Sequence, residues 1–195
     1  MAIAALLEIV EREGAAAITA RAVAESIGYT VGTLYLAFRN LDDLILHGNA
    51  KTLVELGALL KQAAARAGTA QARVRAMGGA YLRFAQRHPE RWQLIFEHRL
   101  PDGADIPDFY LAHITALFTQ VERALEPLLP DAAPGHIAKA ARALWGGVHG
   151  VCILGLTGKL SVASKVSVAS LADTLIDNFL RGLTQHVGRN SRRQY

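Results

Sequence analysis

The sequence predicts an all-α protein. Alanine and leucine are abundant, runs of β-branched residues are few, and apolar residues recur at helical spacing along most of the 195-residue chain. Because 51% of the residues are hydrophobic, the chain can bury a substantial core, either in one domain or in a small domain followed by a larger one. We therefore expect helices throughout, separated by short turns.

A short helix is predicted to begin at Thr19. Its hydroxyl can accept a hydrogen bond from a free backbone N–H of the first turn, and Val23 and Ile27 follow at helical spacing. Gly28 then supplies the permissive backbone that a tight exit from a helix needs. The sequence therefore predicts a helix that ends in a sharp turn.

A second short helix is expected directly after this turn. Thr30 is placed as its N-cap, the helix runs from about 31 to 37, and Leu34 and Phe38 point into a core. The outward side presents small or hydroxyl-bearing residues, namely Gly32, Thr33 and Tyr35. Two such helices form a helix-turn-helix, whose second helix can donate hydrogen bonds to phosphates or base edges. Helix pairs of this kind also occur in ordinary all-α proteins, where Tyr35 would only pack.

The remaining chain divides into helices separated by proline- and glycine-containing breaks. A proline disfavours helical backbone in the residue before it, so Pro89 separates two helices, and clustered turn residues place loops at 101–107 and 127–134. The expected helices span about 41–65, 70–87, 90–98, 108–125, 136–156 and 168–187.

The N-terminal quarter resembles the DNA-binding domain of the tetracycline-repressor (TetR) family. Apolar residues precede Gly14, and the string Gly-Thr-Leu-Tyr-x-x-Phe at 32–38 is specific in this setting. The residues that match are Ala5, Leu7, Ile9, Gly14, Thr19, Val23, Ala24, Ile27, Gly28, Tyr29, Thr30, Gly32, Thr33, Leu34, Tyr35, Phe38, Asp43 and Leu44. Two positions differ from the usual pattern: Leu41 stands where the family has a phosphate-binding Lys, and Ala37 where it has a His.

The resemblance implies a DNA-reading surface on and beside the second helix, with Tyr35 on a phosphate. The candidate DNA-binding residues are Thr19, Arg21, Thr30, Gly32, Thr33, Tyr35, Leu36 and Arg39. Charge points the other way, because residues 1–50 contain three arginines and six carboxylates, a net charge of about −3, although the whole chain has +4. Phosphate contacts dominate nonspecific affinity, so an acidic reading domain predicts weak nonspecific binding. If residues are missing before Met1, they could restore positive charge.

The later chain resembles the WHG-type C-terminal domain found on many TetR-like regulators. The matching residues are Tyr81, Phe84, Ala85, His88, Pro89, Trp92, Trp145, Gly146, Gly147, Val148, His149 and Gly150. Trp145 and His149 are four residues apart and share one helix face. Two matches in the order of the family imply a TetR-type regulator.

A small-molecule pocket is a further expectation for this region. Aromatic and polar side chains that could line it, with a few groups to orient a ligand, are Trp92, Phe96, Phe109, Phe118, Trp145, His149 and Cys152. The effector would be small and apolar or aromatic. The alternative is that these side chains form an ordinary core and that His149 is bonded to a backbone carbonyl.

Catalysis, metal binding and cofactors are not expected. His149 and Cys152 are three residues apart, but the other histidines are scattered, and side chains on one helix face diverge instead of converging on a reacting atom. The single Cys fits a reducing cytoplasm. No signal peptide and no segment long and apolar enough to span a membrane are seen.

The last two helices are expected to form a homodimer. The first of them is rich in glycine, and the second has an apolar stripe whose candidate interface residues are Leu171, Leu175, Phe179 and Leu183. A two-fold protein matches a palindromic operator, because one short helix reads only a few base pairs. The stripe could equally face its own domain.

These observations predict a helix-turn-helix domain at 1–47, a ligand-binding and dimerisation bundle at 48–188, and a disordered basic tail at 189–195. The expected function is a ligand-responsive repressor that binds an operator as a homodimer. Two alternatives stay open: a small-molecule-binding module that has lost DNA binding, favoured by Leu41 and the acidic start, and a helical enzyme.

Overall fold

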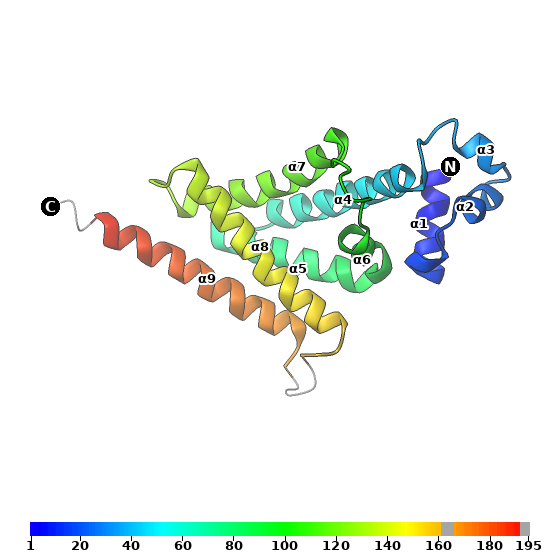
Figure 1. The fold of residues 1–195 in the computed structure, drawn as a ribbon. Coiled ribbons are helices and arrows are strands. Elements are labelled where there is room, and N and C mark those ends of the chain that lie inside the picture. The colour runs from blue at the N-terminus through cyan, green and yellow to red at the C-terminus, as the bar shows by residue number, and fades with distance from the viewer. Residues whose placement is uncertain (161–165, 192–195) are drawn as a thin grey trace. The chain divides into compact units, whose positions relative to one another are not determined.

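The computed structural model describes residues 1–160 and 166–191, with side chains as far as Leu183. Every regular element in these ranges is a helix, which confirms the all-α prediction (Figure 1). The elements are α1 (Ala2–Glu13), η1 (Ala15–Ala17), α2 (Ala20–Ser26), α3 (Val31–Leu34), α4 (Leu41–Ala65), α5 (Ala70–Arg87), α6 (Pro89–Glu97), α7 (Asp108–Leu125), η2 (Glu126–Leu128), α8 (Pro134–Leu156) and α9 (Val168–Ser191). The side chains of the predicted basic tail, 189–195, lie outside the described residues.

The helices gather into two compact units that are not consecutive in sequence. Unit 1 contains residues 1–55 and 87–114, and unit 2 contains residues 56–86 and the described residues from 115 onward. Helix α6 belongs to unit 1 because it packs on α1. Helices α4 and α7 each continue from one unit into the other. The predicted division after residue 47 stays a prediction.

The core of unit 1 holds the helix-turn-helix in place. Leu6 and Val10 of α1, Val23 of α2 and Leu44 of α4 are completely buried. Leu34 of α3 and Leu94 of α6 join them in one apolar cluster. Burying a side chain of this size contributes about 1.5–3 kcal/mol. The short helices α2 and α3 are therefore fixed by tertiary packing on α1, α4 and α6.

Unit 2 contains a helical hairpin in which α8 and α9 lie side by side and antiparallel (Figure 1). Glycines allow the close approach: a Cβ on Gly155 would lie 2.5 Å from Val168 Cγ2, and one on Gly147 would lie 3.1 Å from Leu175 Cδ1. Two of the glycines of α8 thus serve helix packing within this unit.

Gly155→Ala is expected to destabilise the hairpin by about 1–3 kcal/mol, because the added methyl group overlaps the branched side chain of Val168. The matched control is Gly146→Ala, where a Cβ meets no other atom within 4 Å. That substitution should instead raise stability by up to about 1 kcal/mol through helix propensity. Chemical denaturation of the two variants measures the difference, and equal stabilities would contradict the packing described for Gly155.

Candidate DNA-binding surface and ligand cavity

The turn between α2 and α3 is built as the sequence predicts. Thr19 Oγ1 accepts a hydrogen bond of 3.0 Å from the backbone N–H of Ala22, and Thr30 Oγ1 accepts one of 3.2 Å from that of Thr33. Gly28 has a φ of +73°, in the left-handed region that disfavours a side chain. Both predicted caps and the predicted turn glycine are therefore present.

Helix α3 is shorter than the predicted 31–37, since it ends at Leu34. The backbone N–H groups of Leu36 and Ala37 bond to the carbonyls three residues earlier, at 3.2 and 3.1 Å, so the chain continues as tight turns. This geometry keeps Leu34 buried and packs Phe38 against the same core. The residues that follow Leu34 are therefore exposed to solvent in a compact turn.

All eight candidate DNA-binding residues are exposed or accessible in unit 1. Leu36 is 88% exposed, more than any other large hydrophobic side chain that the structure describes, and Tyr35 is 44% exposed. Thr19, Arg21, Thr30, Gly32, Thr33 and Arg39 are exposed as well. Tyr29 was not among the predicted residues, yet it is 52% exposed at the turn. Its place directly after the turn glycine was the available sequence signal.

Arg39 forms an ion pair that orders the end of this segment. The backbone N–H of Arg39 donates to Asp43 Oδ2 at 2.9 Å, and its guanidinium lies 3.3 Å from Oδ1. Burial alone would raise the pKa of Asp43, but the hydrogen bonds and charge of Arg39 lower it overall. Leu41 is half-buried against the apolar cluster of unit 1, whereas Ala37 is exposed.

The acidic residues of the reading domain are largely paired within unit 1. Three of the six carboxylates among residues 1–50 lie within 4 Å of an arginine, and a fourth lies beside His98, whose pKa burial lowers. These pairs are Glu8–Arg12 at 3.8 Å, Glu11–Arg91 at 3.6 Å, Asp42–His98 at 3.4 Å and Asp43–Arg39 at 3.3 Å. Unit 1 as a whole is nevertheless acidic, with seven lysines and arginines against twelve carboxylates.

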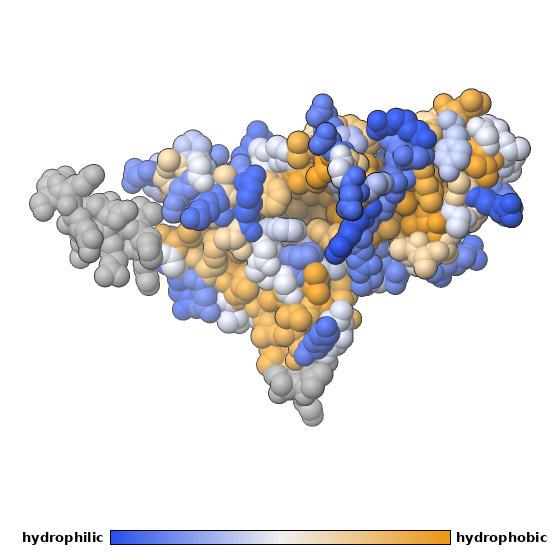
Figure 2. Space-filling view, viewed as in Figure 1, coloured by the Kyte–Doolittle hydropathy of each residue, from blue (hydrophilic) through white to orange (hydrophobic). Residues whose placement is uncertain are grey.

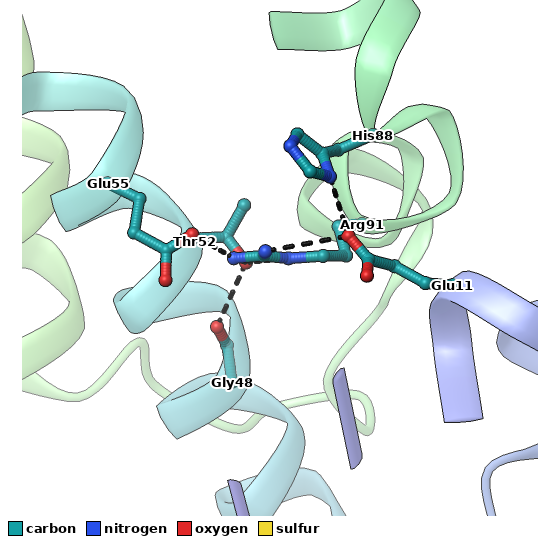
Figure 3. Close-up of polar contacts among 6 residues, drawn as sticks. All are labelled: Glu11, Gly48, Thr52, Glu55, His88 and Arg91. Carbon is teal, nitrogen blue, oxygen red and sulfur yellow. Dashed lines mark hydrogen bonds and ion pairs between the residues drawn. The ribbon is translucent and has the colours of Figure 1, made fainter. Parts of the chain in front are cut away.

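Arg91 is buried where α6 meets α1 and α4 (Figure 3). Its guanidinium lies 2.5 Å from Glu55 and 3.6 Å from Glu11, and it donates to Thr52 Oγ1 at 3.3 Å. His88 lies 2.6 Å from the same Glu11 carboxylate. The Arg91 guanidinium thus links three helices of unit 1 and helps to fix the position of α1.

Unit 2 contains an apolar cavity of about 430 Å³, a volume that includes space open to solvent. Five helices line it, and α5 and α8 contribute most of its wall. The lining residues are Leu60, Val74, Met77, Gly78, Tyr81, Val121, Leu144, Trp145, Val148 and Ile176.

The predicted pocket residues are divided between the two units. Trp145 lines the cavity, His149 stacks on it with ring centroids 4.9 Å apart, and Phe118 meets it edge-on at 5.5 Å. Cys152 is buried one turn further along α8. Trp92, Phe96 and Phe109 belong to unit 1, where Trp92 packs on Phe96 at 5.2 Å and Phe109 stacks on His47 at 4.4 Å.

The pocket prediction named one of the ten lining residues, Trp145, and among the nine that it left out Tyr81 has a polar partner. Its hydroxyl lies 2.8 Å from His149 Nδ1, across 68 positions of sequence. Burial lowers the pKa of His149, so the ring is neutral at pH 7. In the sequence, Tyr81 was singled out only as part of the Tyr-x-x-Phe match. No sequence pattern predicted its contact with His149.

The histidine pKa shifts predict a loss of stability in acid. Burial lowers the pKa of His149 and of His98, so below about pH 6.5 the unfolded chain binds protons that the folded chain binds less readily. The free energy of unfolding should fall between pH 7.5 and pH 5. His149→Asn should show a smaller fall, measured by chemical denaturation at both pH values. An unchanged fall in the variant would contradict a role for His149.

Cys152 shows no sign of reactivity. Burial raises the pKa of its thiol to about 11, which keeps it protonated at neutral pH.

Within residues 1–160 and 166–183, no group of three or more His, Cys, Asp or Glu side chains is placed to hold a metal ion. In the part of the chain that the structure describes, no helix has both the length and the apolarity needed to cross a membrane.

The apolar stripe of α9 consists of two rows. Ala172, Ile176 and Leu180 are buried within unit 2. The predicted interface residues Leu171, Leu175, Phe179 and Leu183 are half-buried beside them. Apolar surface also gathers where α8 ends and α9 begins (Figure 2), including Ile153, Leu154 and Val166, each about 40% exposed or more.

Comparison with family models covers both parts of the chain. Residues 2–47 match the model of bacterial regulatory proteins of the tetR family, and residues 74–179 match the tetracyclin repressor-like C-terminal domain. The chain belongs to the TetR family. TetR-family proteins are DNA-binding transcriptional regulators, so this chain is one too and is not an enzyme, as predicted. The WHG subtype stays a prediction.

One relative and two solved structures are also similar to this chain. An HTH-type transcriptional regulator of Mycobacterium tuberculosis is 29% identical over 155 residues, 78% of this chain and 67% of that protein. A protein from Rhodococcus sp. RHA1 has a TM-score of 0.78 and 24% identity, covering 94% of this chain and 93% of that one. The regulator FadR from Bacillus subtilis, solved with stearoyl-CoA, has a TM-score of 0.73 and 11% identity, covering 93% and 97%. The two solved structures support the fold.

Proposed function

We propose that this TetR-family protein is a ligand-responsive repressor that binds a palindromic operator as a homodimer. The observation that supports this most strongly is the segment 32–36. Its side chains Tyr35 and Leu36 are exposed to solvent, while the apolar core beneath them is buried. Exposing two large side chains in this way has no benefit for folding. Their exposure suits a surface that is covered when DNA binds.

Each exposed group has a plausible DNA partner. The hydroxyl of Tyr35 can donate to a phosphate oxygen, that of Thr33 can hydrogen-bond to a base edge, and Leu36 can make an apolar contact with a thymine methyl group. Arg21 and Thr19, at the start of α2, would contact the sugar-phosphate backbone of the DNA. We assign base reading to Leu36 and Thr33, and backbone contacts to Thr19, Arg21 and Tyr35.

Dimerisation is proposed through α8 and α9. The half-buried row from Leu171 to Leu183 continues the apolar surface around Ile153 and Leu154. A second copy would remove this surface from water, which is favourable at about 25 cal/mol per Å². It would also supply the second reading domain that a two-fold operator requires.

Ligand response is proposed through the cavity of unit 2. Helix α4 contributes Leu60 to the cavity wall and begins at Leu41, directly after the reading segment. A ligand that prefers one conformation of this helix would change operator affinity, typically by about 1–3 kcal/mol of coupling. FadR, whose fold is similar, was solved with stearoyl-CoA, which is consistent with ligand binding by such folds. As a DNA-binding regulator the protein would act in the cytoplasm.

A second candidate is a ligand-binding module with weak or lost DNA binding. The acidic character of unit 1 and the half-buried Leu41 in place of a phosphate-binding Lys favour it. Weak nonspecific binding is expected in either case, so sequence preference distinguishes the two candidates better than affinity does.

In vitro selection from a random duplex library tests the proposal. We expect enrichment of an inverted repeat, and a complex that contains two chains per duplex by native mass spectrometry. A single half-site should bind far more weakly than the repeat. Enrichment of no motif would favour the ligand-binding module, and a motif without internal symmetry bound by one chain would contradict the dimer.

A further inference from the structure

The cavity of unit 2 has an unusually uniform chemistry. None of the ten lining residues that the structure describes is a Lys, Arg, Asp or Glu. Aliphatic side chains, Met77, Trp145 and Gly78 form most of the wall. Tyr81 and Trp145 are the lining residues whose side chains carry a hydrogen-bonding group, and the Tyr81 hydroxyl is engaged with His149.

Two ion pairs join the lining helices outside the cavity. Arg75 of α5 pairs with Asp177 of α9. Arg142 of α8 lies 3.2 Å from Glu122 of α7 and 4.8 Å from the centre of the Phe118 ring. In each pair the cation is about half exposed, at 46% and 56%. Turning either cation toward a ligand would break its existing pair.

His149, which contacts the lining residues Tyr81 and Trp145, adds no charge. Tyr81 and His149 are held together at 2.8 Å, and burial lowers the pKa of the His149 ring. A carboxylate, phosphate or ammonium group entering the cavity would therefore lose its hydration without gaining an opposite charge. The cost of such a transfer is large unless the charge is paired.

We infer that the effector bound in this cavity is uncharged and largely apolar, with a polar group, if it has one, directed at the Tyr81–His149 pair. The inference rests on the proposed ligand response of the same site. By the same argument, a carboxylate, phosphate or cationic group is excluded from the apolar interior of the cavity. Trp145 offers an aromatic face for stacking.

Two dyes that differ by one charged group test the inference on the full-length protein. N-phenyl-1-naphthylamine is neutral, and 1-anilinonaphthalene-8-sulfonate is the same ring system with a sulfonate. We expect saturable fluorescence enhancement with the neutral dye at one molecule per chain. The sulfonate should bind at least roughly 30-fold more weakly, because its charge finds no partner in the cavity.

Two tryptophan substitutions on α7 locate the binding. Val121→Trp places a large ring in the cavity and should abolish binding of the neutral dye. Leu111→Trp is the matched control, because Leu111 lies on the same helix, is 48% exposed and does not line the cavity. If Val121→Trp does not fold by circular dichroism, Trp92→Phe provides a second measurement. Trp145 is then the single Trp of the chain, and its fluorescence should be quenched by energy transfer to the dye.

The outcomes separate this inference from the proposed function. Equal binding of the two dyes, tighter binding of the sulfonate, or no cavity-dependent binding of the neutral dye would overturn the inference. Operator binding measured on the same samples decides the repressor proposal independently. Dye binding that leaves the operator complex intact would support the cavity chemistry and count against ligand response.

Discussion

Leu36→Glu is expected to lower operator affinity by at least about 100-fold without lowering stability. Leu36 is 88% exposed, so the substitution removes no folded-state packing. A carboxylate at this position loses the apolar contact with a thymine methyl group and repels phosphates. One base contact is worth about 1–3 kcal/mol, and a dimer presents two copies of the residue. Fluorescence anisotropy with the selected operator, together with chemical denaturation, measures both quantities.

Two further variants interpret this result. Leu36→Gln removes the apolar contact without adding charge and should cost less affinity than Leu36→Glu. Val54→Glu adds the same charge at another exposed apolar residue of unit 1, on α4, and should leave operator binding close to that of the unaltered protein. Equal losses from Leu36→Glu and Val54→Glu would show that net charge, and not contact by Leu36, controls affinity.

Arg91→Met is expected to destabilise the protein by about 1–3 kcal/mol. The substitution keeps an unbranched aliphatic side chain but removes the guanidinium, which leaves the carboxylates of Glu11 and Glu55 without their shared cation. Removing one partner of a buried ion pair usually costs about 3–5 kcal/mol, but both glutamate side chains here are 40% exposed and can be hydrated. Chemical denaturation gives the loss directly.

Arg87→Met is the control, because Arg87 is exposed at the end of α5 and should contribute little. The double variant Arg91→Met/Glu55→Gln should recover part of the loss, since one unpaired charge is then removed. A double variant that is less stable than Arg91→Met alone would contradict the account of this cluster.

Local features of the fold were predictable because they depend on neighbouring residues. The caps at Thr19 and Thr30 and the turn at Gly28 follow from short-range hydrogen bonding and backbone freedom. Stacking of Trp145 on His149 follows from their spacing on one helix. Early termination of α3 was missed, since residues 35–37 are compatible with a helix and packing of Phe38 decides otherwise.

Long-range features could not be obtained in the same way. Trp92 and Phe96 look like pocket residues in composition, but α6 packs on α1 and places them in unit 1. The partnership of Tyr81 with His149 joins two helices far apart in sequence. The pairing of Glu11 with Arg91 likewise offsets one negative charge of the acidic N-terminal segment. The two residues are far apart in sequence, so only the folded structure shows this pair.

Sequence-specific DNA binding is the central claim, and fluorescence anisotropy of the purified protein tests it most directly. The duplex that lies upstream of its own coding region is titrated at low and moderate salt against a shuffled duplex of the same composition. We predict saturable binding that prefers the native duplex and keeps that preference at moderate salt. Equal binding of the two duplexes at both salt concentrations would contradict the claim if the selection from a random duplex library also enriches no motif.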